Sequence, residues 1–222
     1  MIKIKNITKQ YVLNKNNTVR ALNNINLEFK EGELIVIKGA SGSGKSTLLS
    51  LIAALSKPTS GEVIVDGKQI SKLPDNFASI YRRDNIGFIF QKYNLIPTLS
   101  VEENIALPLV PLNPHAKSLS DKLEVAMEMF HITHKKDVVV KNLSGGEQQR
   151  VAIARANVNN PKIIIADEPT ANLDEKLSLH FIEILRELKA LGKTIVVATH
   201  DPLFFNLDFV DREIEMHNGN LI

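Results

Sequence analysis

The stretch GASGSGKST at residues 39–47 constrains the fold of this chain more than any other part of it. It matches the pattern G-x-x-x-x-G-K-[ST] and stands between the apolar run LIVIK (residues 34–38) and a stretch that suits a helix. Glycines there let the backbone amides turn inward around a phosphate. We expect Lys45 to reach the β- and γ-phosphates and Ser46 to bind Mg²⁺. The residues expected to contact the nucleotide are Gly39, Ala40, Ser41, Gly42, Ser43, Gly44, Lys45, Ser46 and Thr47.

Short apolar runs elsewhere predict the class of fold. They are continuous rather than alternating, which is typical of strands buried on both faces of a parallel sheet, and helical patterns separate them. The runs are LIVIK, GFIF (residues 87–90), KIIIAD (162–167) and TIVVATH (194–200). Residues 1–30 contain alternating apolar positions instead, which indicates antiparallel strands. The end of the chain contains Asn218-Gly219, a strong hairpin signal.

The pattern changes between residues 92 and 160, where strand signals are absent and several prolines separate helical stretches. We expect an α/β fold with a P-loop NTPase core and a mostly parallel sheet. The core would span residues 1–91 and 161–222, with an antiparallel β part at its N-terminus. Residues 92–160 would form an inserted helical subdomain within this single ATPase domain.

Composition limits the compartment and the partners. The formal net charge of the 222 residues is +2, so no strong field for nucleic acid is indicated. The N-terminus has no apolar core of a secretory signal, and no apolar run approaches the ~18 residues of a membrane span. The absence of cysteine excludes disulfides and cysteine-ligated zinc. We expect a cytoplasmic protein whose role at a membrane would come through a partner.

Polar residues follow three of the predicted core strands, at the edge where open α/β sheets bind ligands. Asp167 would complete the Mg²⁺ shell beside the P-loop, and Glu168 would orient or activate the attacking water. Gln91, at the end of GFIF, could reach Mg²⁺ or the water. His200, at the end of TIVVATH, could donate a hydrogen bond to the γ-phosphate. Each could instead be a plain polar cap of its strand.

A second glycine-rich stretch, LSGGE at residues 143–147, lies just before another predicted helix. The helical insertion separates it from the P-loop, so we expect it to act on a nucleotide bound by a second copy of the chain. Ser144, Gly145 and Gly146 would cap the γ-phosphate of that neighbouring ATP. Two identical chains would then bury two nucleotides in a symmetric interface. The simpler interpretation is an ordinary turn that begins a helix.

Taken in order, GASGSGKST, Gln91, LSGGE, IIIADE, ANLD (residues 171–174) and His200 resemble the nucleotide-binding subunits of ABC transporters. The resemblance covers essentially the whole chain. It implies ATP hydrolysis with Mg²⁺, a homodimer that closes on ATP, and an integral membrane permease that docks beside Gln91. It also implies that Tyr11 stacks on adenine and that Asp174 communicates across the dimer interface. FIFQKYNLIPTLSVEENIALPL and LSGGEQQRVAIARA are similar to the MacB, LolD and FtsE branch, which favours export or extrusion.

Other ABC ATPases carry the same motifs. A DNA-repair ATPase of the SMC kind would need a long heptad insertion between the P-loop and LSGGE, and a ribosome-associated ABC-F factor would need two cassettes. A stand-alone regulatory or nucleic-acid-associated ATPase is the alternative that remains. The cargo and the direction of transport are not encoded in these motifs.

Overall fold

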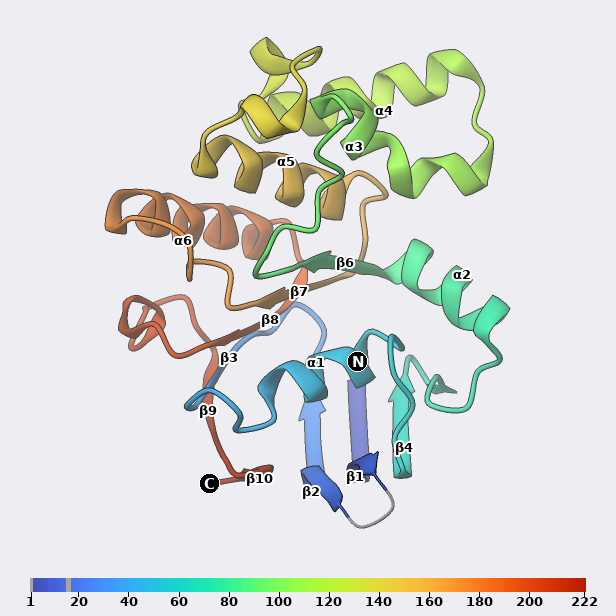
Figure 1. Ribbon diagram of the computed structural model, residues 1–222, viewed down its shortest axis with the longest axis vertical. Helices are drawn as coiled ribbons and strands as arrows, with labels where there is room; N and C mark the ends of the chain where they lie inside the picture. The colour runs from blue at the N-terminus through green and yellow to red at the C-terminus, as the bar shows by residue number, and fades with distance from the viewer. Residues whose placement is uncertain (1, 15–16) are drawn as a thin grey trace.

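The computed structural model describes residues 2–14 and 17–222. Its centre is a six-stranded sheet in the order β10-β9-β3-β8-β7-β6 (Figure 1). The strands are β3 (Leu34–Lys38), β6 (Ile86–Ile89), β7 (Ile163–Asp167), β8 (Thr194–Thr199), β9 (Arg212–His217) and β10 (Asn220–Leu221). Strands β9, β3, β8, β7 and β6 pair in parallel, and β10 pairs with β9 in antiparallel. The predicted parallel sheet is therefore confirmed.

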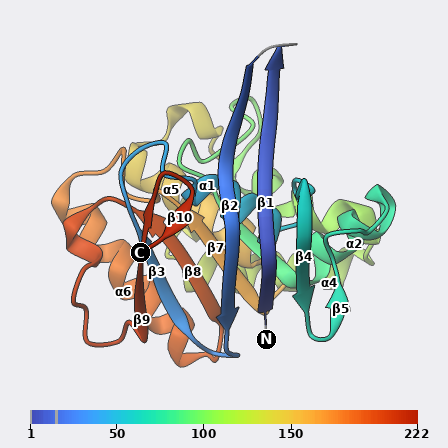
Figure 2. The same cartoon turned by 90° about the horizontal axis from the view of Figure 1, so that it is seen from below.

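The second sheet is antiparallel and has the order β2-β1-β4-β5. Its strands are β1 (Ile2–Asn14), β2 (Asn17–Phe29), β4 (Ser60–Val65) and β5 (Lys68–Gln69). Viewed from below, β1 and β2 form a long hairpin that extends beyond the body of the molecule (Figure 2). This sheet is the antiparallel part that the alternating N-terminal residues predict.

Two apolar clusters lie on opposite faces of the central sheet, because successive residues of a strand point to opposite sides. Leu34 and Val36 face the cluster that contains the helices after β6, whereas Ile35 and Ile37 face the cluster shared with α1 and the antiparallel sheet. Burial on both faces explains why these strands are continuous apolar runs.

The helices form two groups. Helix α1 (Lys45–Ile52) packs on the face toward the antiparallel sheet, while α3, α4 and α5 stack on the other side above α6 (Figure 1). Their bounds are α2 (Asp75–Asn85), α3 (Val101–Ala106), α4 (Ala116–Met129), α5 (Gly145–Asn157) and α6 (Glu175–Ala190). Short 3-10 helices are η1 (Leu107–Leu112), η2 (Thr133–Lys135), η3 (Val140–Asn142) and η4 (Pro202–Phe204). Residues 92–160 are thus helical as expected, although a boundary between subdomains at these residues stays a prediction.

None of the helices within residues 2–14 and 17–222 is long and apolar enough to cross a bilayer.

Candidate functional site

The P-loop connects β3 to α1, and its shape requires glycine. Gly39, Gly42 and Gly44 have φ values of 151°, 80° and 106°. A Cβ atom on Gly39 would collide with the backbone oxygen of Met216, and one on Gly44 would lie 2.5 Å from the backbone oxygen of Ala21. The loop is therefore wedged between β2 and β9, and residues with side chains do not fit at these two positions.

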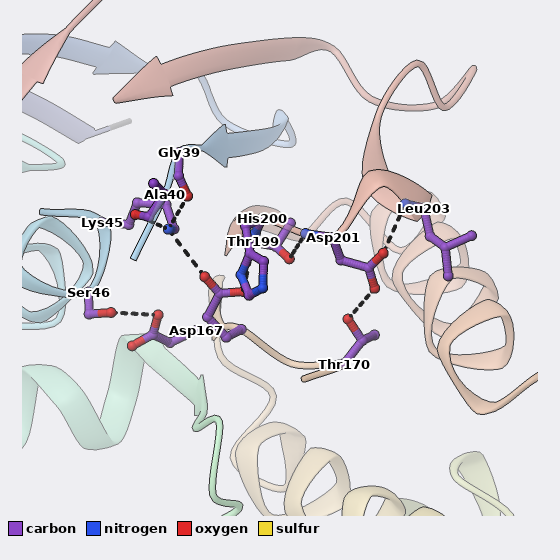
Figure 3. A network of polar contacts seen from close by, with 11 residues as sticks. Gly39, Ala40, Lys45, Ser46, Asp167, Thr170, Thr199, His200, Asp201 and Leu203 are labelled. Atoms are coloured by element: carbon purple, nitrogen blue, oxygen red, sulfur yellow. Dashed lines mark hydrogen bonds and ion pairs between the residues drawn. The ribbon is translucent and has the colours of Figure 1, made fainter. Parts of the chain in front are cut away.

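Lys45 is the first residue of α1, and its ammonium group lies inside the loop. Its Nζ donates to the backbone oxygens of Gly39 and Ala40 at 2.6 and 3.2 Å, and it lies 3.2 Å from Oε1 of Glu168 (Figure 3). The lysine side chain is only 5% exposed. A buried cation encircled by a glycine loop fits a polyphosphate, because its charge is weakly screened there.

Glu168 follows β7 and has the unusual φ of 45°. Its Oε2 atom lies 2.9 Å from Nδ1 of His200 and accepts the backbone N–H of His200 at 3.2 Å. Burial opposes ionisation of Glu168, but the hydrogen bond from His200 and the charge of Lys45 outweigh it and lower its pKa. The carboxylate is therefore ionised at neutral pH and able to accept a proton.

The Nδ1–H group of His200 donates a hydrogen bond to this carboxylate, since an ionised carboxylate can only accept. Its remaining ring nitrogen, Nε2, could donate to a phosphate only in the doubly protonated imidazolium form. The donation to the γ-phosphate that the sequence suggests therefore needs a second proton or a rearranged ring, and it stays a prediction.

Ser46 and Asp167 fit a magnesium ion. The Ser46 hydroxyl donates to Oδ1 of Asp167 at 2.9 Å, so two hard oxygen ligands already lie side by side (Figure 3). Burial raises the pKa of Asp167. The described residues contain no group of three His, Cys, Asp or Glu able to hold a metal. A site of one carboxylate and one hydroxyl suits Mg²⁺, which keeps several waters and takes further ligands from substrate phosphates.

We call the cavity over the loop the P-loop cleft. It has a volume of about 550 Å³ and is lined by residues 41–47 together with Gln91, Glu168, His200, Asn218 and part of β2. The carboxyl ends of β6, β7 and β8 thus bring Gln91, Glu168 and His200 to the cleft, and Asp167 bonds to Ser46 beside it. The role of each residue stays a prediction.

Tyr11 lies on β1 opposite Val19 of β2, and its side chain is 40% exposed. Val19 and Arg20 line the P-loop cleft, whereas Tyr11 is not among its lining residues. The ammonium group of Lys9 lies over the Tyr11 ring, 4.9 Å from its centroid. Stacking of adenine on Tyr11 therefore stays a prediction.

LSGGE forms the start of α5. Ser144 caps the helix: its hydroxyl accepts the N–H of Glu147, and Glu147 Oε2 accepts the N–H of Ser144 at 2.8 Å. The backbone N–H and hydroxyl of Ser144 lower the pKa of Glu147 to about 2. The N–H groups of Gly145 and Gly146 stand in the first turn, where a helix supplies no acceptor of its own. Such free amides at a helix N-terminus favour an anion.

The cavity at LSGGE, here called the signature cavity, is separate from the P-loop cleft. It has a volume of about 590 Å³, and its lining includes Ser144, Gly145, Gly146, Glu147, Asn172 and Asp174. Asp174 caps α6 by accepting the N–H of Leu177 at 2.8 Å. The two cavities share no lining residue.

Two residues that hold the site together are not among the site residues that the sequence predicts. Asn172, within ANLD, donates to the backbone oxygen of Gln91 at 2.9 Å. Arg155, in α5, donates to the backbone oxygens of Tyr93 and Asn94 at 2.5 and 2.6 Å. Their positions within ANLD and LSGGEQQRVAIARA are the only sequence signal for them, because a hydrogen bond to a backbone oxygen leaves no pattern at the acceptor.

A glycine loop that encloses a buried lysine, a serine–aspartate pair and an ionised glutamate define a P-loop nucleoside triphosphatase. A family model described as "ABC transporter" matches residues 22–171. The ABC transporter ATP-binding protein MJ0796 of Methanocaldococcus jannaschii is 47% identical over 206 residues, which cover 90% of this chain and 87% of the relative. The chain belongs to the ABC transporter family and is an ATP-hydrolysing subunit.

A solved dimer of MJ0796 bound to ADP and Pi, described as a post-hydrolysis state, has a TM-score of 0.91 to this chain. The two chains are 42% identical in that comparison, which covers 100% of this chain and 96% of the other. The macrolide export protein MacB of Campylobacter jejuni is 40% identical over 222 residues, covering 100% of this chain but 34% of MacB. The methionine import protein MetN of Haemophilus influenzae is 42% identical over 202 residues, covering 90% of this chain and 58% of MetN.

Proposed function

We propose that two copies of this chain enclose two ATP molecules, each between the P-loop of one copy and the LSGGE segment of the other. The observation that carries this proposal is the separation of the P-loop cleft from the signature cavity within one chain. The two cavities share no lining residue, so one chain does not present LSGGE to its own cleft, whereas two-fold symmetry pairs the two surfaces twice. The dimer of MJ0796 supports the same oligomeric state.

Hydrolysis in this arrangement needs positioning and charge neutralisation more than covalent chemistry. Lys45 would hold the β- and γ-phosphates, and Glu168 would take a proton from the attacking water. Because Lys45 pairs with Glu168 at 3.2 Å, a phosphate in the loop would compete for the ammonium group and leave Glu168 available to water. Ser46 and Asp167, with Gln91, would hold Mg²⁺, which neutralises phosphate charge when bound.

The LSGGE segment would bind the outer phosphate of the partner's ATP through backbone amides and the helix dipole. Gly145 has open space around its Cβ position, so it faces outward. A Cβ on Gly146 would lie 2.8 Å from Cδ2 of Leu177, so this position is packed against α6. A substitution at Gly145 therefore probes this surface without disturbing the packing against α6.

Closure of the dimer on ATP would drive an integral membrane permease, with the chain held at the cytoplasmic face of the membrane by that partner. Similarity to MacB over the whole chain favours an export or extrusion machine, although the methionine importer MetN is similar to nearly the same degree. We propose no nucleic-acid partner.

Gly145→Asp tests the shared site. It should leave ATP binding by the monomer within about twofold of the parent, and it should weaken ATP-dependent dimerisation at least about tenfold, because its carboxylate faces the partner's γ-phosphate. In a Glu168→Gln background, sedimentation with ATP measures the monomer and dimer populations, and a fluorescent ATP analogue measures binding by the monomer. Ser118→Asp, which adds the same charge to the exposed surface of α4, is the matched control. Loss of monomeric ATP binding by Gly145→Asp would place LSGGE at its own chain's nucleotide.

A further inference from the structure

One side chain connects the two cavities within a chain. Asn172 lines the signature cavity, and its Nδ2 atom donates to the backbone oxygen of Gln91, which lines the P-loop cleft. We propose that Asn172 is a positioning residue for ATP hydrolysis. It ties the main chain of Gln91 to the ANLD turn, so that the reach of the Gln91 side chain into the cleft depends on the state of the dimer interface.

Gln91 lies where the chain has left the sheet, because β6 ends at Ile89. The segment beyond it turns through two consecutive left-handed residues, Tyr93 and Asn94, with φ values of 57° and 49°. Arg155 of α5 holds the backbone oxygens of both residues. The turn after Gln91 is therefore fixed to the helix that begins at LSGGE.

Further along, the fully buried Asn104 of α3 fixes the same segment. Its Oδ1 accepts the N–H of Ile96 at 2.8 Å, and its Nδ2 donates to the backbone oxygen of Ile96 at 3.1 Å. Together with the bonds from Arg155, these contacts hold residues 93–96 to helices α3 and α5. Gln91 itself is held by a residue outside these helices, by Asn172 in the turn before α6.

The Asn172 contact is suited to transmitting a displacement. It is a single hydrogen bond between two neutral groups on an exposed residue, so a small movement of the ANLD turn lengthens it and weakens it steeply. Asp174, two residues away, is expected at the interface with the partner chain. Within the described residues the Gln91 side-chain amide has no hydrogen-bond partner, which leaves it free to follow its main chain.

The inference rests on the proposed function, because it takes Gln91 as part of the hydrolytic site. Asn172→Ala should lower kcat about three- to tenfold, the effect of one lost neutral hydrogen bond, with the KM for ATP changed less than about twofold. Asn172→Asp should be at least as slow, since its carboxylate faces the Gln91 oxygen. Asn76→Ala, a change of the same type on the exposed face of α2, is the matched control and should keep the parent rate.

A double-mutant cycle separates positioning from a structural role. If Asn172 acts through the Gln91 side chain, Asn172→Ala should add less than about twofold in a Gln91→Ala background. If Gln91→Ala is slow and Asn172→Ala lowers kcat just as much in that background, the positioning of Gln91 by Asn172 is overturned, while the role of Gln91 in hydrolysis stands. Parent-like hydrolysis by Gln91→Ala would instead overturn the role of Gln91 in the proposed function and the inference with it. Thermal melting of each variant identifies loss of activity that comes from unfolding.

Discussion

Lys45→Ala is expected to lower ATPase turnover at least about a hundredfold and to weaken ATP binding, because the ammonium group is the cation at the centre of the loop. No other described lysine or arginine forms an ion pair with Glu168. Phosphate release measures turnover, and a fluorescent ATP analogue measures binding. Lys72→Ala removes the same charge from a side chain that is 72% exposed, and it should keep the parent rate.

The loss must come from the site rather than from unfolding. Removing Lys45 leaves the Glu168 carboxylate with His200 as its remaining side-chain partner, which costs stability. The melting temperature of Lys45→Ala should therefore be compared with that of the parent. A folded Lys45→Ala protein that hydrolyses ATP at the parent rate would show that GASGSGKST is not the nucleotide site.

Glu168→Gln is expected to stop turnover, by about 10²- to 10⁴-fold in kcat, while ATP binding is retained. The amide keeps the volume of the carboxylate and can still bond to His200, but it cannot accept a proton from water. Loss of the ion pair with Lys45 also frees the ammonium group for phosphate, so ATP affinity should stay equal or rise. The variant should accumulate as an ATP-bound dimer.

Sedimentation in the presence of ATP and Mg²⁺ measures this accumulation, and the same experiment with ADP is its control. Changing the nearby Asp201 to Asn would not be equivalent to Glu168→Gln. Asp201 accepts hydrogen bonds from Thr170 and Leu203 and does not line the P-loop cleft. Glu168→Gln that hydrolyses ATP at a tenth of the parent rate or faster would argue that another group activates the water.

The sequence predicts the central sheet well because burial on both faces leaves a continuous apolar run. The run LIVIK matches β3 at both ends, and the acids Asp167 and Glu168 at the end of β7 lie beside the loop as the shared strand edge requires. Asn218-Gly219 makes the turn between β9 and β10, and both residues have positive φ values of 48° and 77°. These features follow from local rules.

Helix α2 is not evident from the sequence, because the usual signal for the start of a helix is missing. It begins after Pro74 with no side chain that caps it, and its apolar residues do not mark a buried face: Phe77 and Ile80 are 54% and 44% exposed, and Ala78 is its only buried residue. The pairing of Asn172 with Gln91 is equally hidden. The two residues lie 81 positions apart, and a carboxamide that bonds to a backbone oxygen needs no particular residue opposite it.

The two glycines of LSGGE differ in the fold in a way that the sequence does not show. The motif LSGGE presents Gly145 and Gly146 as equivalent, yet one faces open space and the other packs on Leu177. Helical geometry separates their directions, and only the position of α6 decides which one is free. The capping box between Ser144 and Glu147 is the part of LSGGE that spacing alone could predict.

The most direct test of the central claim, that LSGGE acts on the nucleotide of the partner chain, is to mix Lys45→Ala with Gly145→Asp. Each homodimer carries two defective sites. A mixed dimer carries both defects in one site and an intact P-loop opposite an intact LSGGE in the other.

ATPase activity should return on mixing and be highest near equal amounts, at up to about one quarter of the parent activity if each intact site turns over independently. Differently tagged chains and co-purification with ATP establish that mixed dimers form. No recovery of hydrolysis at any ratio, with mixed dimers demonstrated and both variants folded, would contradict the account.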